Sequence, residues 1–268
     1  MNYSRFLEKY NHSQKEVFSL KFALITGATS GIGFELAKLF AQNGYGLVLV
    51  SSNQNHLDNV KNSLETSYSI PIYIFEQDLT KIDAAEQLYH QIRKEKISIA
   101  VLINNAGFGL VGATDEIDLR QDEQMITVNV TNLVLLCKLF LLDMYKQRTG
   151  KILNVASTGA FQPGPYTSTY FASKAFVLNY TRAIRYEAKS KGVVISTLCP
   201  GATKTNFFNR EGTITPHTAM SAEKVAQIAF RGLQKNKEII IPGLKNRLLQ
   251  LFPVKVKMIS VAKMKQNK

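Results

Sequence analysis

The sequence is poor in the residues that build disulfide frameworks and metal centres. Its 268 residues include only two cysteines and four histidines. Two cysteines cannot form a disulfide framework, and a reducing compartment is the simpler interpretation. The histidines lie far apart, and none stands at a metal-ligand spacing from a cysteine or carboxylate, so we expect no metal site. These residues are Cys137, Cys199, His12, His56, His90 and His217.

Targeting signals and long apolar runs are also missing. Residues 1–9 have no apolar core of signal-peptide length and no small-residue cleavage site. We find no stretch of about 20 predominantly apolar residues, the length that a membrane-spanning helix requires. We therefore expect a cytoplasmic protein without a membrane span, and leave peripheral association with a membrane open.

Positive charge dominates and is unevenly distributed. Lysine and arginine total 33 against 20 acidic residues, a net charge of +13. Residues 245–268 contain seven basic residues and no acidic one. Such a tail suits an anionic surface of lipid or nucleic acid, but a solvated, partly disordered terminus is the bland alternative. The sequence shows no helix-turn-helix or aromatic-basic groove pattern, so we expect no nucleic-acid partner.

Short apolar runs alternate with longer segments of helical periodicity, in a chain whose 45% hydrophobic content is ordinary for a globular protein. The short runs are apolar on both faces, as are strands of a parallel sheet that is covered on both sides. Alternation of strands with helices predicts βαβ units. We expect strands at 22–26, 46–50, 70–75, 99–103, 151–155, 193–198 and 238–241.

No internal repeat or linker divides the chain. The sequence predicts one α/β domain over residues 21–243, a doubly wound parallel sheet of seven strands with helices on both faces. An extension at 1–20, with apolar residues at helical spacing, and the basic tail at 244–268 flank it. For residues 201–220 we predict a long functional loop. We expect helices at about 32–40, 57–64, 85–92, 125–142, 169–189 and 222–233.

A glycine-rich turn joins the first strand to the first helix. Thr26-Gly27-Ala28-Thr29-Ser30-Gly31-Ile32-Gly33 spaces its glycines as G-x-x-x-G-x-G. They permit a tight turn and close approach of the backbone to a pyrophosphate, while the helix N-terminus supplies free N–H groups. Glycines at such a junction can also serve packing alone. The candidate cofactor-binding residues here are Gly27, Thr29, Ser30, Gly31, Ile32 and Gly33.

Cofactor choice depends on the end of the second strand, where Ser51-Ser52-Asn53 contains no acidic residue. An acid there holds the ribose hydroxyls of NAD and repels the 2′-phosphate of NADP. Hydroxyl groups can hydrogen-bond a phosphate, so Ser51 and Ser52 favour NADP(H) over NAD(H). No arginine stands here to strengthen the preference, and a polar turn without a role in specificity is the alternative.

Polar residues also follow the third and fourth strands. Asp78 and Leu79 come after the third strand, and Asn104-Asn105-Ala106-Gly107 after the fourth. In open α/β sheets the ligand crevice lies at the carboxyl ends of the strands. Asparagine and glycine are ordinary turn residues as well, so neither motif decides the matter alone.

A tyrosine–lysine pair is the strongest chemical signal. Tyr170 and Lys174 stand four residues apart and share one face of an expected helix. An unperturbed tyrosine has a pKa of about 10, and an adjacent cation lowers it toward the range that general acid–base catalysis needs. Ser157 follows the fifth strand, and its hydroxyl can hydrogen-bond a substrate oxygen.

With these motifs in this order, residues 21–242 resemble the short-chain dehydrogenase/reductase superfamily, in its short single-domain branch. The resemblance implies a Rossmann-type fold in which Tyr170 is the general acid/base and Ser157 positions the substrate oxygen. It implies that Lys174 lowers the tyrosine pKa and holds the nicotinamide ribose, and that Asn129 supports a water that relays protons.

The same resemblance extends to the cofactor. It implies that Asn105, Ala106 and Gly107 line the adenosine-ribose side. Pro200 and Gly201 precede Thr203, which would contact the nicotinamide carboxamide. In relatives the helix around 125–142 and the Tyr170 helix form a subunit interface, so we expect a homodimer or homotetramer.

Together, residues and resemblance predict an enzyme, an NADP(H)-dependent oxidoreductase that transfers a hydride between nicotinamide and a carbonyl or secondary alcohol. Apolar candidate pocket residues favour a lipid-like or ring substrate, although they also suit loop packing. A catalytically silent dinucleotide-binding regulator and a membrane-surface protein anchored by its basic tail remain as alternatives. The candidate pocket residues are Phe108, Phe161, Pro163, Pro165, Tyr166, Phe207 and Phe208.

Overall fold

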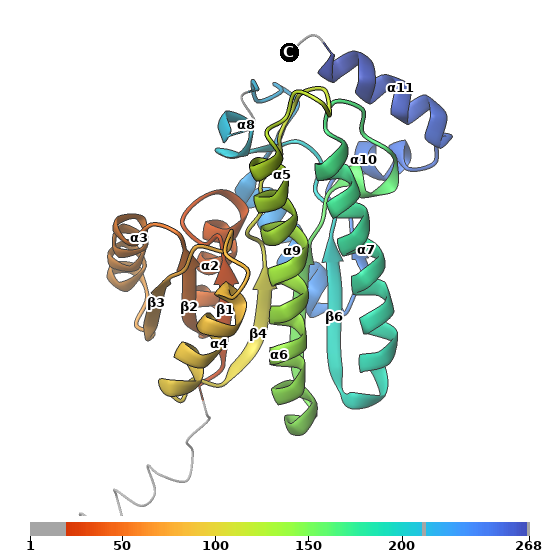
Figure 1. Ribbon diagram of the computed structural model, residues 1–268. Coiled ribbons are helices and arrows are strands. Elements are labelled where there is room, and N and C mark those ends of the chain that lie inside the picture. The colour runs from red at the N-terminus through yellow and green to blue at the C-terminus, as the bar shows by residue number, and fades with distance from the viewer. Residues whose placement is uncertain (1–19, 211–212, 267–268) are drawn as a thin grey trace, which may run out of the picture.

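The computed structural model describes residues 20–210 and 213–266, in which seven parallel strands form one sheet in the order β3-β2-β1-β4-β5-β6-β9 (Figure 1). The predicted doubly wound sheet is confirmed. Its winding reverses between β1 and β4, the point at which open α/β sheets bind ligands. The strands are β1 (Phe22–Thr26), β2 (Gly46–Ser51), β3 (Ile72–Glu76), β4 (Ile99–Asn104), β5 (Gly150–Val155), β6 (Val193–Leu198) and β9 (Ile239–Ile240).

Helices cover both faces of the sheet, as Figure 1 shows. Residues of α4, α6 and α7 belong to one apolar core, and residues of α2, α3 and α9 to the other. These helices are α2 (Gly31–Gln42), α3 (Gln54–Ser67), α4 (Ala84–Lys94), α6 (Asn132–Gln147), α7 (Ser168–Ala188) and α9 (Ala222–Gln234).

Successive side chains of each strand pack alternately into the two cores. In β1, Leu24 contributes to the core under α6, whereas Ala23 and Ile25 contribute to the core under α2. Successive side chains on a strand point to opposite faces, so a run that is apolar throughout can bury both faces. Each fully buried leucine or isoleucine contributes about 1.5–3 kcal/mol to the stability of the fold. Strands that bury both faces therefore need continuous apolar runs, and such runs can be recognised in the sequence.

The helix predicted at 125–142 belongs to a longer helical run, Leu119–Gln147. It comprises α5 (Leu119–Ile126), the π-helix η1 (Thr127–Thr131) and α6. The run is long and apolar enough to cross a membrane, so our expectation that no such stretch exists is wrong. Half of its most apolar window is buried, and α6 contacts α4, β4 and β5. A core helix needs this composition as much as a membrane helix does.

The predictions for the two ends of the chain can be compared with the structure only at the C-terminal end. The helix expected within residues 1–20 lies outside the described residues, apart from Leu20. The basic tail forms two helices, α10 (Leu244–Leu249) and α11 (Val254–Lys265), separated at Pro253. The interpretation of the tail as partly disordered is therefore wrong for residues 244–265. Figure 1 places both helices over the carboxyl ends of the strands.

The long loop predicted at 201–220 contains short elements of its own. Strands β7 (Thr203–Lys204) and β8 (Met220–Ser221) pair in parallel, and α8 (Phe207–Arg210) lies between them in the chain. The loop leaves the sheet after β6 and returns to it through α9 and β9. It therefore stays at the edge where the predicted site residues gather.

Candidate functional site

A cavity of about 680 Å³ lies at the carboxyl ends of the strands, across the point where the winding reverses. Its floor comes from the turns that follow β1 to β6, and one wall comes from α7. The segment around α8 and the two tail helices complete it from above (Figure 1). A concave, largely apolar site at this position is where a ligand is expected in an open α/β sheet.

The glycine turn after β1 forms one end of this cavity. Gly27 and Gly31 take φ angles of +63° and +56°, a region that glycine adopts without strain. A Cβ on Gly33 would stand 2.3 Å from the carbonyl oxygen of Gly27, so helix and strand pack this closely only with glycine there. The side chain of Ser30, the N-cap of α2, makes no capping hydrogen bond.

This turn fits a dinucleotide pyrophosphate. Helix N-termini leave backbone N–H groups without partners in the helix, and the dipole favours an anion there. Asn105 fixes the turn from the neighbouring strand, since its Nδ2 donates to the carbonyl oxygens of Thr26 at 2.9 Å and Gly27 at 3.1 Å. Asn105 therefore holds the cradle in shape as well as lining the cavity.

Serine hydroxyls occupy the end of β2. The Oγ of Ser51 lies 3.3 Å from the Oγ1 of Thr29, which joins the second strand to the glycine turn. Ser52 is exposed and also lines the cavity. Asp78 turns inward to its own loop, where its Oδ1 accepts from the backbone N–H and the hydroxyl of Thr80. The cavity at the end of β2 thus presents hydroxyl groups, while the Asp78 carboxylate is hydrogen-bonded to Thr80.

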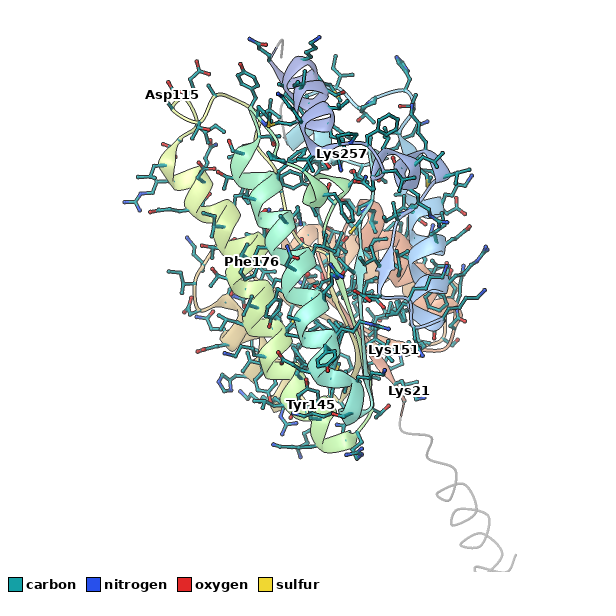
Figure 2. The ribbon with its side chains drawn as sticks, turned by 90° about the vertical axis from the view of Figure 1, so that its right-hand side faces the viewer. Lys21, Asp115, Tyr145, Lys151, Phe176 and Lys257 are labelled. Carbon is teal, nitrogen blue, oxygen red and sulfur yellow. The ribbon has the colours of Figure 1, made fainter. Side chains whose placement is uncertain are left out.

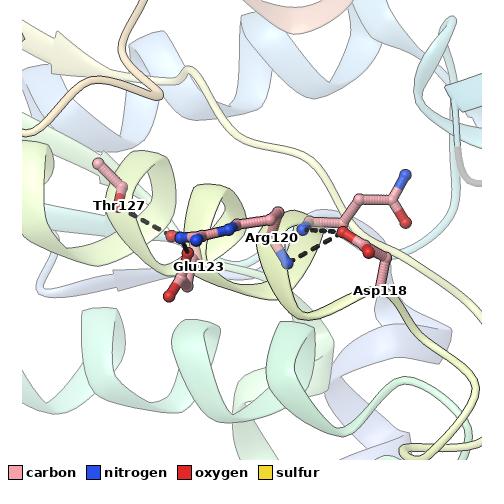
Figure 3. A network of polar contacts seen from close by, with 5 residues as sticks. Asp118, Arg120, Glu123 and Thr127 are labelled. Atoms are coloured by element: carbon pink, nitrogen blue, oxygen red, sulfur yellow. Dashed lines mark hydrogen bonds and ion pairs between the residues drawn. The ribbon is translucent and has the colours of Figure 1, made fainter.

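The π-helix η1 places Asn129 behind the cavity wall. Asp118 caps α5 by accepting from the N–H groups of Arg120 and Gln121, and the Thr127 hydroxyl donates to the Glu123 carbonyl where the π-helix begins (Figure 3). A π-turn adds a residue to the helix and is frequent at functional sites. This irregularity could not be predicted, because the apolar periodicity of the sequence continues through residues 127–131.

Asn129 is fully buried, and its side chain hydrogen-bonds to two separate parts of the chain. Its Nδ2 donates to the Phe108 carbonyl at 2.9 Å and to the Ser173 hydroxyl at 3.1 Å, while its Oδ1 accepts from the Phe108 N–H. These bonds tie the turn after β4 to α7. The water-relay role of Asn129 stays a prediction, and the structure adds that Asn129 positions the chain beside Lys174.

Tyr170, Lys174 and Ser157 all line the cavity. The Lys174 Nζ lies 5.8 Å from the centre of the Tyr170 ring. The Ser157 Oγ accepts from the Gly159 N–H at 3.0 Å, which orients the hydroxyl at the start of a 3₁₀ turn. The ring of Tyr170 packs against Phe207, with ring centres 5.4 Å apart.

Lys174 is electrostatically unusual. It is 4% exposed, and its Nζ donates to the Val155 carbonyl at 3.0 Å. Burial lowers the pKa of this ammonium to about 8, because the charged form loses its hydration. Burial also raises the pKa of the neighbouring Cys199 thiol to about 12, so this thiol is neutral at pH 7. None of the ion pairs between described residues includes Lys174.

Most of the predicted site residues line this one cavity. The exceptions are Gly33, which acts through packing, and Asn129, which lies behind the wall. The residues that line it are Gly27, Thr29, Ser30, Gly31, Ile32, Ser51, Ser52, Asp78, Leu79, Asn105, Ala106, Gly107, Ser157, Tyr170, Lys174, Pro200, Gly201 and Thr203.

The apolar pocket candidates divide into two groups. Phe108, Phe207 and Phe208 line the cavity. Those on the turn after Ser157 do not, and Phe161 packs instead against the core on the α6 side of the sheet. The candidates that do not line the cavity are Phe161, Pro163, Pro165 and Tyr166, and for Phe161 the structure supports the alternative of packing against the body.

The tail helices are the part of the site that the sequence analysis missed. One face of α11 lines the cavity, and its residues recur at helical spacing. The Nζ of Lys257 donates to the Phe161 carbonyl at 3.3 Å and joins this helix to the turn after Ser157. Periodicity across 256–265 was the available signal. The lining residues of α11 are Val256, Lys257, Ser260, Val261, Met264 and Lys265.

Comparison with known proteins agrees with this geometry. The family profile described as short chain dehydrogenase matches residues 21–213, more than half of the chain. The chain belongs to the short-chain dehydrogenase family. It is 33% identical over 186 residues to very-long-chain 3-oxoacyl-CoA reductase-A of Danio rerio, covering 67% of this chain and 57% of that protein. It is 34% identical over 195 residues to 17-beta-hydroxysteroid dehydrogenase type 3 of Homo sapiens, covering 69% and 60%.

A solved structure resembles this short-chain dehydrogenase over more of its length. The short-chain dehydrogenase from Sphingobium yanoikuyae in complex with NADPH superposes with a TM-score of 0.81 at 30% identity, covering 90% of this chain and 96% of that one. By contrast, the chain spans less than two thirds of the two relatives named above. The family profile ends at residue 213, before the tail helices begin.

Proposed function

We propose that the protein is an NAD(P)-dependent oxidoreductase that interconverts a carbonyl and a secondary alcohol on an apolar substrate. One observation carries the proposal. A single cavity holds the glycine cradle at one end and Tyr170, Ser157 and Lys174 at the other. A nicotinamide bound there supplies or accepts the hydride. The NADPH complex of the Sphingobium relative supports a nicotinamide cofactor.

The roles of the three side chains follow from their chemistry. Tyr170 donates a proton to the oxygen as negative charge develops on it, and accepts the proton in the reverse direction. Ser157, whose Oγ already accepts from Gly159, donates its own hydrogen to the same oxygen. Lys174 places a cation beside the Tyr170 ring and stabilises negative charge on the phenolic oxygen. Asn129 holds the neighbouring backbone.

The substrate half of the cavity is predominantly apolar. Phe207 and Phe208 line it from the loop, and Val256, Val261 and Met264 from α11. Apolar surface of this kind binds a hydrocarbon chain or ring system through burial. The names of the two relatives point to a long-chain acyl thioester and a steroid, both largely apolar. We therefore propose a lipid-like or ring substrate for this protein.

The test is a panel of long-chain ketones, 3-oxoacyl thioesters, oxosteroids and the matching alcohols, followed by NADPH and NADH absorbance. We expect turnover with at least one apolar carbonyl and a higher kcat/KM with NADPH than with NADH. Nucleotide binding without turnover across the whole panel would favour the catalytically silent regulator. A preference for NADH would contradict the interpretation of Ser51 and Ser52, while leaving the chemistry intact.

We also propose that the protein forms a homodimer or homotetramer through α6 and α7. These helices lie side by side, with Phe176 of α7 on the face toward the viewer (Figure 2). Large apolar side chains are exposed there, including Leu142 at 58% and Tyr186 at 86%. Phe176 and Tyr180 stack with ring centres 5.8 Å apart. We expect sedimentation to show an oligomer at micromolar concentration that Phe176→Glu dissociates. A wild-type monomer would contradict this assignment.

A further inference from the structure

Helix α11 carries apolar side chains, interspersed with lysines, on two opposite faces. The inner face of α11 lines the cavity, as described above. The outer face, with Val254, Lys255, Met258, Ile259 and Lys263, does not line it. A helix that is apolar on both sides is normally covered on both sides, yet Val254 and Ile259 are exposed. Something outside the described chain is therefore expected to cover this face.

Exposed apolar side chains are concentrated in this segment. Of the eighteen large apolar residues that are exposed in the described chain, nine lie between Leu244 and Met264. The most exposed, Leu251 at 80%, lies in the connection between α10 and α11. Four of these residues, Leu249, Phe252, Val256 and Met264, line the cavity, and the other five do not. Exposed apolar residues that gather outside a cavity mark an interaction site with another protein or with a membrane. The nine are Leu244, Leu248, Leu249, Leu251, Phe252, Val254, Val256, Ile259 and Met264.

The charge of the segment selects among possible occupants. Residues 245–268 carry seven basic residues and no acid. Positive charge continues onto the adjoining sheet edge, where Arg247 of α10 lines a second cavity of about 500 Å³ with Arg231, Lys235 and Lys237. Among the described residues, no acidic side chain lines that cavity. An anionic lipid surface complements this combination of apolar and basic residues. A second copy would bring the same basic face against itself in a two-fold contact, which like charges oppose.

We propose that α10 and α11 dock on an anionic bilayer, with Leu248, Leu251, Val254 and Ile259 inserted between the headgroups and the basic residues at the headgroup level. The inner face of the same helices borders the substrate half of the cavity, so docking places the entrance of the cavity against lipid. An apolar substrate then enters from the bilayer. The last step rests on the proposed function, whereas the docking step does not.

The experiment compares the wild-type chain with a Leu251→Glu/Val254→Glu double variant. Neither residue lines the cavity, and Val254 is the first residue of α11, where a carboxylate is compatible with the helix dipole. Ile82→Glu, at a side chain that is 74% exposed far from the tail in sequence, is the matched control. Each is sedimented with phosphatidylcholine vesicles, with and without about 30% phosphatidylserine.

We expect the wild type and Ile82→Glu to bind the phosphatidylserine vesicles, with binding weakened in about 0.5 M salt. The double variant should bind at least about tenfold more weakly, because it removes two insertions and adds two negative charges. Turnover of a short, water-soluble ketone should change less than about twofold. Wild-type protein that ignores anionic vesicles while turning over this ketone would overturn the docking proposal and leave the proposed function intact. An oligomer that the double variant dissociates, without any vesicle binding, would assign the face to a second copy and overturn the proposal as well.

Discussion

Replacing Tyr170 with phenylalanine is expected to lower kcat by about 10²–10⁴-fold, the range that a general acid–base group typically contributes. The change removes only the phenolic hydroxyl. The ring that packs against Phe207 remains, so the cavity wall should keep its shape. Nucleotide affinity should change less than about threefold, since the glycine cradle lies at the other end of the cavity. Stopped-flow or steady-state kinetics and fluorescence titration with NADPH measure the two effects separately.

Tyr180→Phe is the matched control for this variant. It makes the same chemical change ten residues further along α7, where Tyr180 stacks on Phe176 and does not line the cavity. Its kcat should stay within about twofold of the wild type. Retention of more than about a tenth of wild-type turnover by Tyr170→Phe would mean that another group supplies the proton.

Lys174 should make the stability of the protein depend on pH in a particular direction. Its pKa is lowered from 10.5 to about 8 in the folded state. Between these values the unfolded chain binds the proton and the folded chain does not, so the free energy of unfolding rises with pH across this window. Below pH 8 both states are protonated, and the full cost of burying the ammonium is present. The difference should reach about 2 kcal/mol between pH 7.5 and pH 10.

Lys174→Met isolates this effect, because it has no proton to release. The free energy of unfolding of both proteins is measured with urea at several pH values. In the difference between the two proteins, the contributions of other titratable groups cancel. The wild type should gain stability relative to the variant as pH rises, and a flat difference would contradict the lowered pKa. The variant should also lose about 10²-fold in kcat at neutral pH, because the cation beside Tyr170 is removed. A folded variant with wild-type activity would exclude Lys174 from catalysis.

Much of the fold could be predicted because its strands are locally distinctive. Runs such as Phe22–Thr26 and Val193–Leu198 are apolar throughout, and both occur as strands with the predicted bounds. The strand predicted at 238–241 is shorter in the structure, Ile239–Ile240, because it pairs only with β6 at the edge of the sheet. Site residues at the carboxyl ends of strands were predictable for a related reason, since sheet topology brings those ends together.

What could not be predicted depends on contacts between distant segments. The π-helix around Asn129 is set by bonds to Phe108 and Ser173, which apolar periodicity does not record. The contribution of the tail helices to the cavity was missed because their composition suits a solvated terminus equally well. Their order comes from packing over the cavity and from the bond between Lys257 and the Phe161 carbonyl.

The division of the cavity between early and late parts of the chain has a consequence for how its specificity can diverge. The pyrophosphate cradle is encoded within the first 110 residues and the reacting groups by residue 174, whereas much of the cover over the substrate half is encoded after residue 243. Changes confined to the last 25 residues can therefore alter which molecules are accepted while redox chemistry and nucleotide use are inherited unchanged. Exchanging residues 244–268 between homologous enzymes should therefore change the range of substrates that they accept.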